Sequence, residues 1–171
     1  VGAQWLPDGQ RVLYSAGTST DMDLWLYDVS AGTSSQLTNS ASVIDKYPRI
    51  SPDGSTVLFQ RSNEYRLTDL SGNENPLSNA SDFSPFIVRW VPSSSELSAV
   101  GYNLNTASYE LRFYDASGSL LETIAYDAEF TSGSIPLQWN ASGTLSSGMI
   151  AETDDQENLE QYDLTVFDRD T

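Results

Sequence analysis

The chain of 171 residues contains no histidine and no cysteine. Without histidine there is no imidazole base, no Ser-His-Asp triad and no imidazole ligand for a metal. Without cysteine there is no disulfide, no thiolate nucleophile and no zinc or iron–sulfur site of the usual kinds. The only lysine is Lys46, and neither a phosphate-binding glycine-rich loop with lysine nor a Gly-x-Ser-x-Gly elbow is present. These absences predict a protein that works by binding, without catalysis and without a cofactor.

Positive charge is also scarce, with 8 basic residues against 24 acidic ones and a formal net charge of −16. A nucleic-acid partner needs a basic surface to neutralise phosphates, and an anionic membrane surface needs the same. No apolar run approaches the length of about 20 residues that spans a bilayer. The composition therefore excludes these partners and membrane insertion. It leaves either a solvated acidic surface or a patch that attracts a basic partner.

A turn sequence recurs every 40 to 49 residues. Trp-Leu-Pro-Asp-Gly at 5–9 returns as Ile-Ser-Pro-Asp-Gly at 50–54, and in weaker form as Trp-Val-Pro-Ser-Ser at 90–94 and Trp-Asn-Ala-Ser-Gly at 139–143. Proline presets the second position of a β-turn, and glycine accepts the left-handed position that closes a hairpin. Gly9 and Gly54 are therefore expected to have positive φ, and Ser94 takes the same place in the third repeat.

A second, independent mark follows each turn: an alternating strand that ends in aspartate, at 24–28, 65–69, 111–115 and 164–168. Another strand lies between the two marks, at 12–14, 57–59 and 97–99. In the fourth repeat it is weak, at 146–148, and could shift toward 149–150. A fourth short run follows at 36–38, 76–78 and 121–124, with none in the last repeat. Each repeat thus predicts four short antiparallel strands.

The predicted fold class is all-β, a β-propeller or propeller segment of about four four-stranded blades in a single domain. The approximate repeats are 1–45, 46–86, 87–135 and 136–171. One four-stranded sheet cannot bury both of its faces, whereas stacked sheets can. A β-sandwich with chance similarity between its turns is the alternative.

The two marks resemble the TolB-like and WD-repeat-like β-propeller repeats, whose usual turn is Trp-Ser-Pro-Asp-Gly. Residues 51–54 and 36–38 match that pattern closely, and the third and fourth repeats are eroded. The resemblance implies that the strand carrying the tryptophan is innermost. Such repeats form periplasmic TolB, the gating propellers of prolyl-oligopeptidase-like and tricorn-like peptidases, and extracytoplasmic sensor domains of membrane-anchored transcription regulators.

From this resemblance we expect a periplasmic or extracytoplasmic binding module. The sensor domain is the leading hypothesis, with a peptidase propeller or a TolB-like scaffold as alternatives. The expected partner is a protein, a peptide or a small signal molecule.

The aromatic residues divide into two groups. Trp5, Trp90 and Trp139 occupy equivalent repeat positions, completed by Ile50, and equivalent placement predicts core between blades. A second group lies on the connections into the innermost strands, where propellers commonly bind: Tyr47, Phe83 and Phe86. We predict that this second group contacts the partner.

Two acidic clusters could hold a hard cation, although solvated loops are the ordinary interpretation. One is Asp21 with Asp23; the other is Asp154, Asp155 and Glu157. The repeats give four inner strands but three outer ones. An open arc of blades would expose apolar faces that include Trp5 and Phe167, and we then expect either pairing with a second copy or further blades in a longer parent protein. A closed ring of four blades is the alternative.

Overall fold

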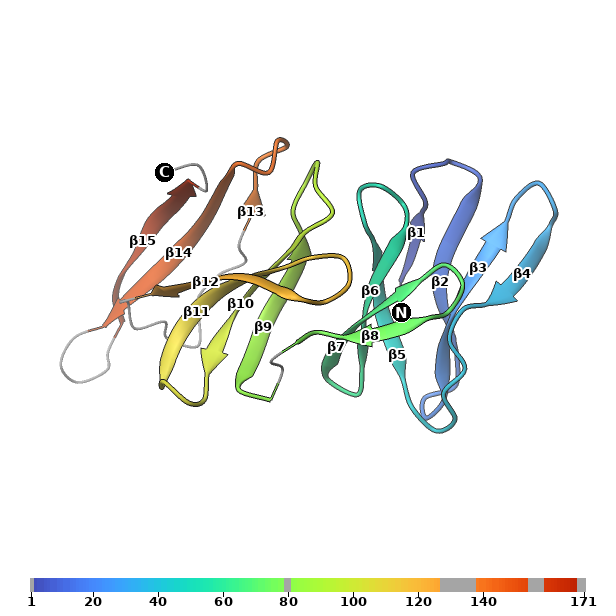
Figure 1. Cartoon of the computed structure of the whole chain (residues 1–171), viewed down its shortest axis with the longest axis horizontal. Coiled ribbons are helices and arrows are strands. Elements are labelled where there is room, and N and C mark those ends of the chain that lie inside the picture. The colour runs from blue at the N-terminus through green and yellow to red at the C-terminus, as the bar shows by residue number, and fades with distance from the viewer. Residues whose placement is uncertain (1, 79–80, 127–137, 154–158, 169–171) are drawn as a thin grey trace. The chain divides into compact units, whose positions relative to one another are not determined.

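The computed structural model describes residues 2–78, 81–126, 138–153 and 159–168. Within these ranges fifteen strands form four antiparallel sheets, each built from strands consecutive in the sequence (Figure 1). The described residues contain no helix, so none is long and apolar enough to cross a membrane. The all-β prediction is confirmed, and we call the sheets blades 1 to 4.

Each blade is built from three or four strands that are consecutive in the sequence. Blade 1 comprises β1 (Ala3–Trp5), β2 (Arg11–Gly17), β3 (Met22–Asp28) and β4 (Thr33–Gln36). Blade 2 comprises β5 (Asp45–Ile50), β6 (Thr56–Arg61), β7 (Glu64–Asp69) and β8 (Glu74–Pro76). Blade 3 comprises β9 (Phe83–Trp90), β10 (Leu97–Asn103), β11 (Ser108–Tyr114) and β12 (Leu120–Tyr126). Blade 4 comprises β13 (Gln138–Trp139), β14 (Leu145–Thr153) and β15 (Leu159–Asp168).

The chain divides into two compact units. Unit 1 contains residues 1–78 with the turn 116–119, and therefore blades 1 and 2. Unit 2 contains residues 79–115 and 120–171, and therefore blades 3 and 4.

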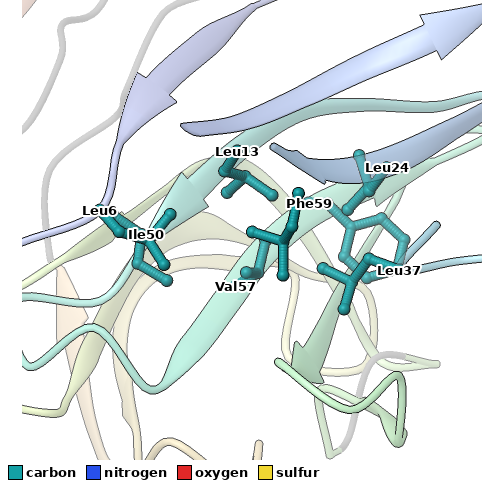
Figure 2. Packing of buried hydrophobic residues seen from close by; sticks show 8 residues of the cluster. Leu6, Leu13, Leu24, Leu37, Ile50, Val57 and Phe59 are labelled. Carbon is teal, nitrogen blue, oxygen red and sulfur yellow. The ribbon is translucent and has the colours of Figure 1, made fainter. Parts of the chain in front are cut away.

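Unit 1 is held together by a core between its two blades (Figure 2). Alternation along β2 and β3 sends one set of leucines, among them Leu13 and Leu24, to the face that meets blade 2. Ile50, Val57 and Phe59 come from blade 2 to meet them. Burying one such side chain stabilises the fold by about 1.5–3 kcal/mol. This cluster therefore fixes the spacing of the two blades.

Unit 2 has a corresponding core between blades 3 and 4. Val100, Leu111 and Phe113 are buried in it, and Trp139 of blade 4 packs against them. The Trp139 ring meets the Phe113 ring edge-on at 5.9 Å between centroids, and its indole Nε1 donates a 2.8 Å hydrogen bond to Ser98 Oγ. A polar bond thus orients the aromatic residue within an apolar contact.

The repeated turn has the predicted glycine conformation in blades 1 and 2, where φ is 66° at Gly9 and 77° at Gly54. In blade 3 the amide of Ser94 donates to the Val91 carbonyl as expected, but the left-handed residue is Ser93, with φ of 61°. A positive φ at the third residue of a turn is typical of a type II turn. In the turns of blades 1 and 2 the positive φ falls on the fourth residue, which is the glycine. The sequence alignment of the turn is right, and its geometry in blade 3 differs.

The prediction that Trp5 is core is wrong. Ile50 and Trp139 occupy the same repeat position, and each packs on the second and third strands of the blade before it in its unit. Trp5 is 58% exposed because no sheet covers that face of blade 1 within unit 1. Trp90 is half-buried, and the Phe167 side chain lies outside the described residues.

Candidate functional site

Tyr47 is an exposed aromatic residue held in a β-bulge of β5, the first strand of blade 2. Lys46 pairs with Gln60 and Arg49 with Leu58, so that Tyr47 and Pro48 together face one residue of β6. Tyr47 has a φ of 55°, which is rare for a bulky residue, and its side chain is 50% exposed. The Lys46 ammonium lies 5.3 Å from the centre of the Tyr47 ring. The bulge turns the ring out of the sheet and towards solvent.

Phe86 also lies in a bulge, in β9 of blade 3. Pro85 pairs with Gly101 and Ile87 with Val100, which leaves Phe86 without a cross-strand partner. Its side chain is 56% exposed. Both exposed aromatic residues of the predicted partner-binding group therefore lie in a bulge of the first strand of their blade, although the two bulges differ in register.

Two tyrosines continue the Phe86 surface. The Phe86 ring lies 6.1 Å from the Tyr109 ring, and Tyr109 meets Tyr102 edge-on at 5.1 Å. Tyr102 and Tyr109 are direct cross-strand partners on β10 and β11. The three rings form a continuous aromatic surface beside the β10–β11 turn, where Leu104 is also exposed.

Phe83 does not belong to this surface, and its predicted contact with a partner is corrected here. Its side chain is 3% exposed and lies beneath the Arg112 guanidinium, whose central carbon is 4.3 Å from the ring centre. Gly101 makes this possible, since a Cβ there would collide with the Ser84 carbonyl oxygen and lie 2.7 Å from the Phe83 ring. Phe83 thus supports the bulge from below instead of facing solvent.

Beneath the Tyr47 bulge lies a buried ion network. The Asp45 carboxylate, fully buried, accepts two hydrogen bonds of 2.7 Å from Arg61 Nε and Nη2. Arg61 also donates to Glu74, at 2.7 Å from Nη1 and 2.9 Å from Nη2. Hydrogen bonding to Asp45, and then to Glu74, raises the pKa of the Arg61 guanidinium above its ordinary value. The network locks the start of β5 to the end of β6.

A second network supports the Phe86 bulge. Arg112 donates to Glu110 at 2.8 Å and to Asp82 at 3.1 Å, and Asn103 donates to Glu110 at 2.7 Å. Burial opposes the charge on Arg112, yet its hydrogen bonds to Asp82 and Glu110 prevail and raise its pKa. The hydrogen bond from Arg112 lowers the pKa of Asp82.

Sequence reasoning missed these two networks, although a signal was present. Asp45-Lys46-Tyr47-Pro48 and Asp82-Phe83-Ser84-Pro85 share the spacing Asp-x-x-Pro at the entrance to an innermost strand. In both, the aspartate binds an arginine from another strand of its own blade. The shared spacing marks the places where the bulged aromatic residues are supported.

The carboxylates proposed as cation ligands have other partners where the structure describes them. Asp21 accepts from the Ser42 amide at 3.1 Å. Asp23 accepts from Gln36 Nε2 at 2.9 Å and from the Ser40 amide at 3.2 Å. They tie the β4–β5 connection to the start of β3. Within the described ranges no three aspartate or glutamate residues are grouped to hold a metal ion.

The remaining acidic cluster lies outside the described residues: Asp154, Asp155 and Glu157. A cation site there stays a prediction.

Comparison with known proteins places the chain among β-propellers. No protein-family model matches it. Dipeptidyl-peptidase 5 from Porphyromonas gingivalis is 26% identical over 108 residues, which cover 53% of this chain and 16% of that protein. The chain therefore spans a small part of this curated relative.

Solved structures resemble the chain at lower identity. TolB from Acinetobacter baumannii matches with a TM-score of 0.58 and 20% identity, over 100% of this chain and 41% of that one. Prolyl oligopeptidase B from Galerina marginata matches with a TM-score of 0.68 and 14% identity, over 99% and 24%. The propeller domain of the trilobed protease from Pyrococcus furiosus, described as having an open velcro topology, matches with a TM-score of 0.61 and 15% identity. The match covers 92% of this chain and 50% of that one. These matches confirm the propeller fold.

Proposed function

Since the chain has a TolB-like β-propeller fold, we propose that it is a non-catalytic propeller segment that binds polypeptide through bulged aromatic residues, Tyr47 in unit 1 and Phe86 in unit 2, each as a separate contact point. The observation that carries the proposal is their exposure: 50% at Tyr47 and 56% at Phe86, each in a bulge of the first strand of its blade. Bulges are frequent beside functional sites because they redirect a side chain out of the sheet. Holding a large aromatic side chain in water with a left-handed backbone, as at Tyr47, disfavours the folded state, which supports a binding role.

The chemistry at each of the two bulges favours a peptide with basic residues. Aromatic rings supply large contact area at low entropic cost and attract cations over their faces. The net charge of −16 adds long-range attraction for a basic partner and repels an acidic one. A nucleic-acid ligand is not supported by this charge.

The setting that we propose first is the propeller part of a peptidase. The curated relative is a dipeptidyl-peptidase, and two of the solved structures reported above are peptidases. A TolB-like periplasmic scaffold is the second setting, supported by the TolB match. The sensor domain of a transcription regulator, expected from the sequence, gains no specific support from these relatives.

Fluorescence anisotropy with two labelled, unstructured peptides tests the binding proposal. One peptide alternates lysine and leucine, and the other has glutamate in place of lysine. We expect the lysine peptide to bind more tightly than the glutamate peptide. Tyr47→Ser and Phe86→Ser should each lower the affinity for the lysine peptide by about tenfold, the size of a moderate hot spot. The matched controls are Val29→Ser and Leu121→Ser, which remove exposed apolar side chains elsewhere and should leave affinity unchanged. Equal losses in all four variants would contradict the proposal.

The proposed lack of catalysis has a separate test. We expect no turnover of fluorogenic peptide or ester substrates by the purified chain, because histidine and cysteine are missing. Turnover that a single substitution in this chain abolishes would overturn it, whatever the peptide-binding result.

A further inference from the structure

The only lysine of the chain contacts an aromatic ring. Lys46 precedes Tyr47 on β5, and its ammonium lies 5.3 Å from the centre of the Tyr47 ring. Within the described ranges Lys46 forms no ion pair with a carboxylate, although the chain has 24 acidic residues. Four arginines do form such pairs: Arg11, Arg61, Arg66 and Arg112. Attraction between opposite charges therefore does not explain where the Lys46 side chain lies.

The bulge of β5 creates this contact. Consecutive side chains of a regular strand point to opposite faces of the sheet, which would separate Lys46 from Tyr47. The pairing is regular at Lys46, which faces Gln60, and becomes irregular at Tyr47, where φ is 55°. One residue before Lys46, the Asp45 carboxylate fixes the strand through its two hydrogen bonds from Arg61. The contact lies entirely within unit 1, between neighbours in the sequence.

The Lys46 ammonium occupies the surface that a cationic partner would use. The face of an aromatic ring carries negative charge density and attracts ammonium and guanidinium groups. The Tyr47 side chain is 50% exposed, so a partner can reach it. The four-carbon stem of lysine is flexible, so the ammonium can leave the ring without any movement of β5. A site that is open for only a fraction of the time has an apparent affinity lowered by that fraction.

We propose that Lys46 is a movable cover on the Tyr47 contact point and thereby sets its affinity for basic peptides. In the free protein the Lys46 ammonium lies on the ring, and it leaves when a cationic side chain of the partner takes its place. The proposal rests on the function proposed above, since it assumes peptide binding at Tyr47. A ligand that offers a cation alone gains little, because it only replaces Lys46. Loss of the Lys46 charge, by substitution or by acetylation, uncovers the ring.

Fluorescence anisotropy with the lysine peptide tests this role in two matched backgrounds. In Phe86→Ser, binding reports on the Tyr47 contact point, and adding Lys46→Met should raise the affinity about two- to fivefold, the effect of one exposed cation–aromatic contact. Methionine keeps an unbranched apolar stem and removes the ammonium. In Tyr47→Ser, binding reports on Phe86, and the same addition should leave the affinity unchanged.

Two results of this experiment would overturn the proposal. Equal gains in both backgrounds would mean that Lys46 acts through net charge and not through the Tyr47 ring. Weaker binding of the glutamate peptide to Lys46→Met, with no gain for the lysine peptide, would mean that Lys46 itself contacts the partner.

Nuclear magnetic resonance of protein labelled with ¹³C-lysine tests the cover directly, because one lysine gives one set of signals. We expect the Lys46 ε-protons to be shielded by the ring, and the shielding to disappear in Tyr47→Ser and on saturation with unlabelled lysine peptide. Identical shifts in wild type and Tyr47→Ser would overturn the proposal, whether or not peptides bind. Shielding that persists while no variant binds the lysine peptide would instead refute the proposed function, and with it the regulatory role, but not the contact.

Discussion

Asp45 and Arg61 are cross-strand partners at the ends of β5 and β6, and two hydrogen bonds of 2.7 Å join them side by side. The carboxylate has no exposed surface, and the guanidinium is also bound by Glu74. This paired geometry closes the end of blade 2 directly below the Tyr47 bulge. The pair therefore links the stability of the blade to the position of its exposed aromatic residue.

Removing the buried carboxylate should be costly. Asp45→Ala removes two charge-assisted hydrogen bonds but leaves the Arg61 guanidinium bound to Glu74, so we expect a loss of about 1.5–3 kcal/mol in the free energy of unfolding. Urea unfolding measures this loss. The control is Glu64→Ala, which removes the exposed contact of 4.0 Å between Glu64 and Arg66 and should cost about 1 kcal/mol or less. Similar losses in both variants would show that Asp45 is not a buried anchor.

Gly54 is the clearest test of the turn that defines the repeat. Its φ of 77° strains any residue with a Cβ, and that Cβ would lie 3.2 Å from Pro7 Cδ. Gly54→Val should lower the free energy of unfolding by about 1–3 kcal/mol. Gly2→Val is the matched control, because a Cβ at Gly2 meets no atom within 4 Å and its φ is ordinary. An unaffected Gly54→Val protein would argue against the turn geometry.

Most of the fold could be predicted because its signals are local. Turns with proline, aspartate and glycine, and strands that end in aspartate, repeat within a few residues of one another. Hairpins between consecutive strands then follow directly, as the four sheets show. The weak strand of the fourth repeat was also located, since β14 runs from Leu145 to Thr153 and includes both suggested segments.

The candidate site could be predicted only in part, because burial there depends on long-range register. Phe83 and Phe86 look alike in the sequence, yet Phe83 is buried beneath Arg112, whereas Phe86 lies in the bulge near Gly101 and is exposed. A bulge changes which face each following residue takes, and no local pattern at 83–86 fixes its position. Trp5 shows the same limit, since its exposure depends on what lies next to blade 1 and not on its own repeat.

Gly101 gives a direct test of the Phe86 bulge. Gly101→Ala places a Cβ against the Ser84 carbonyl oxygen and the Pro85 Cα, both backbone atoms that cannot yield without moving β9. We expect a loss of about 1–3 kcal/mol, as for overpacking in a core. Near-ultraviolet circular dichroism should also change, because the Phe86, Tyr109 and Tyr102 rings shift. A stable protein with an unchanged aromatic spectrum would contradict the described bulge.

The hydrogen bond between Arg112 and Asp82 predicts how stability responds to acid. Arg112 lowers the pKa of Asp82 below the ordinary value of 3.8, so the folded state binds the proton more weakly than the unfolded state. The charged Asp82 carboxylate therefore adds its full share to the free energy of unfolding at pH values above 3.8. That share is lost as the pH falls from 3.8 towards the lowered pKa of Asp82 in the folded state. Urea unfolding of wild type and Asp82→Asn, from neutral pH to about pH 3, should show a difference in stability that is constant near neutrality and shrinks below about pH 4.

Glu122→Gln is the control for that experiment, since it removes an exposed carboxylate with the same change in net charge. The general relief of repulsion in this acidic chain is common to all three proteins and cancels when they are compared. A gap between wild type and Asp82→Asn that stays constant through the acid range would mean that the Arg112 contact does not distinguish the charged from the neutral carboxyl. In that case Arg112 would be held near the Phe86 bulge by its ion pair with Glu110 and by its contact with the Phe83 ring.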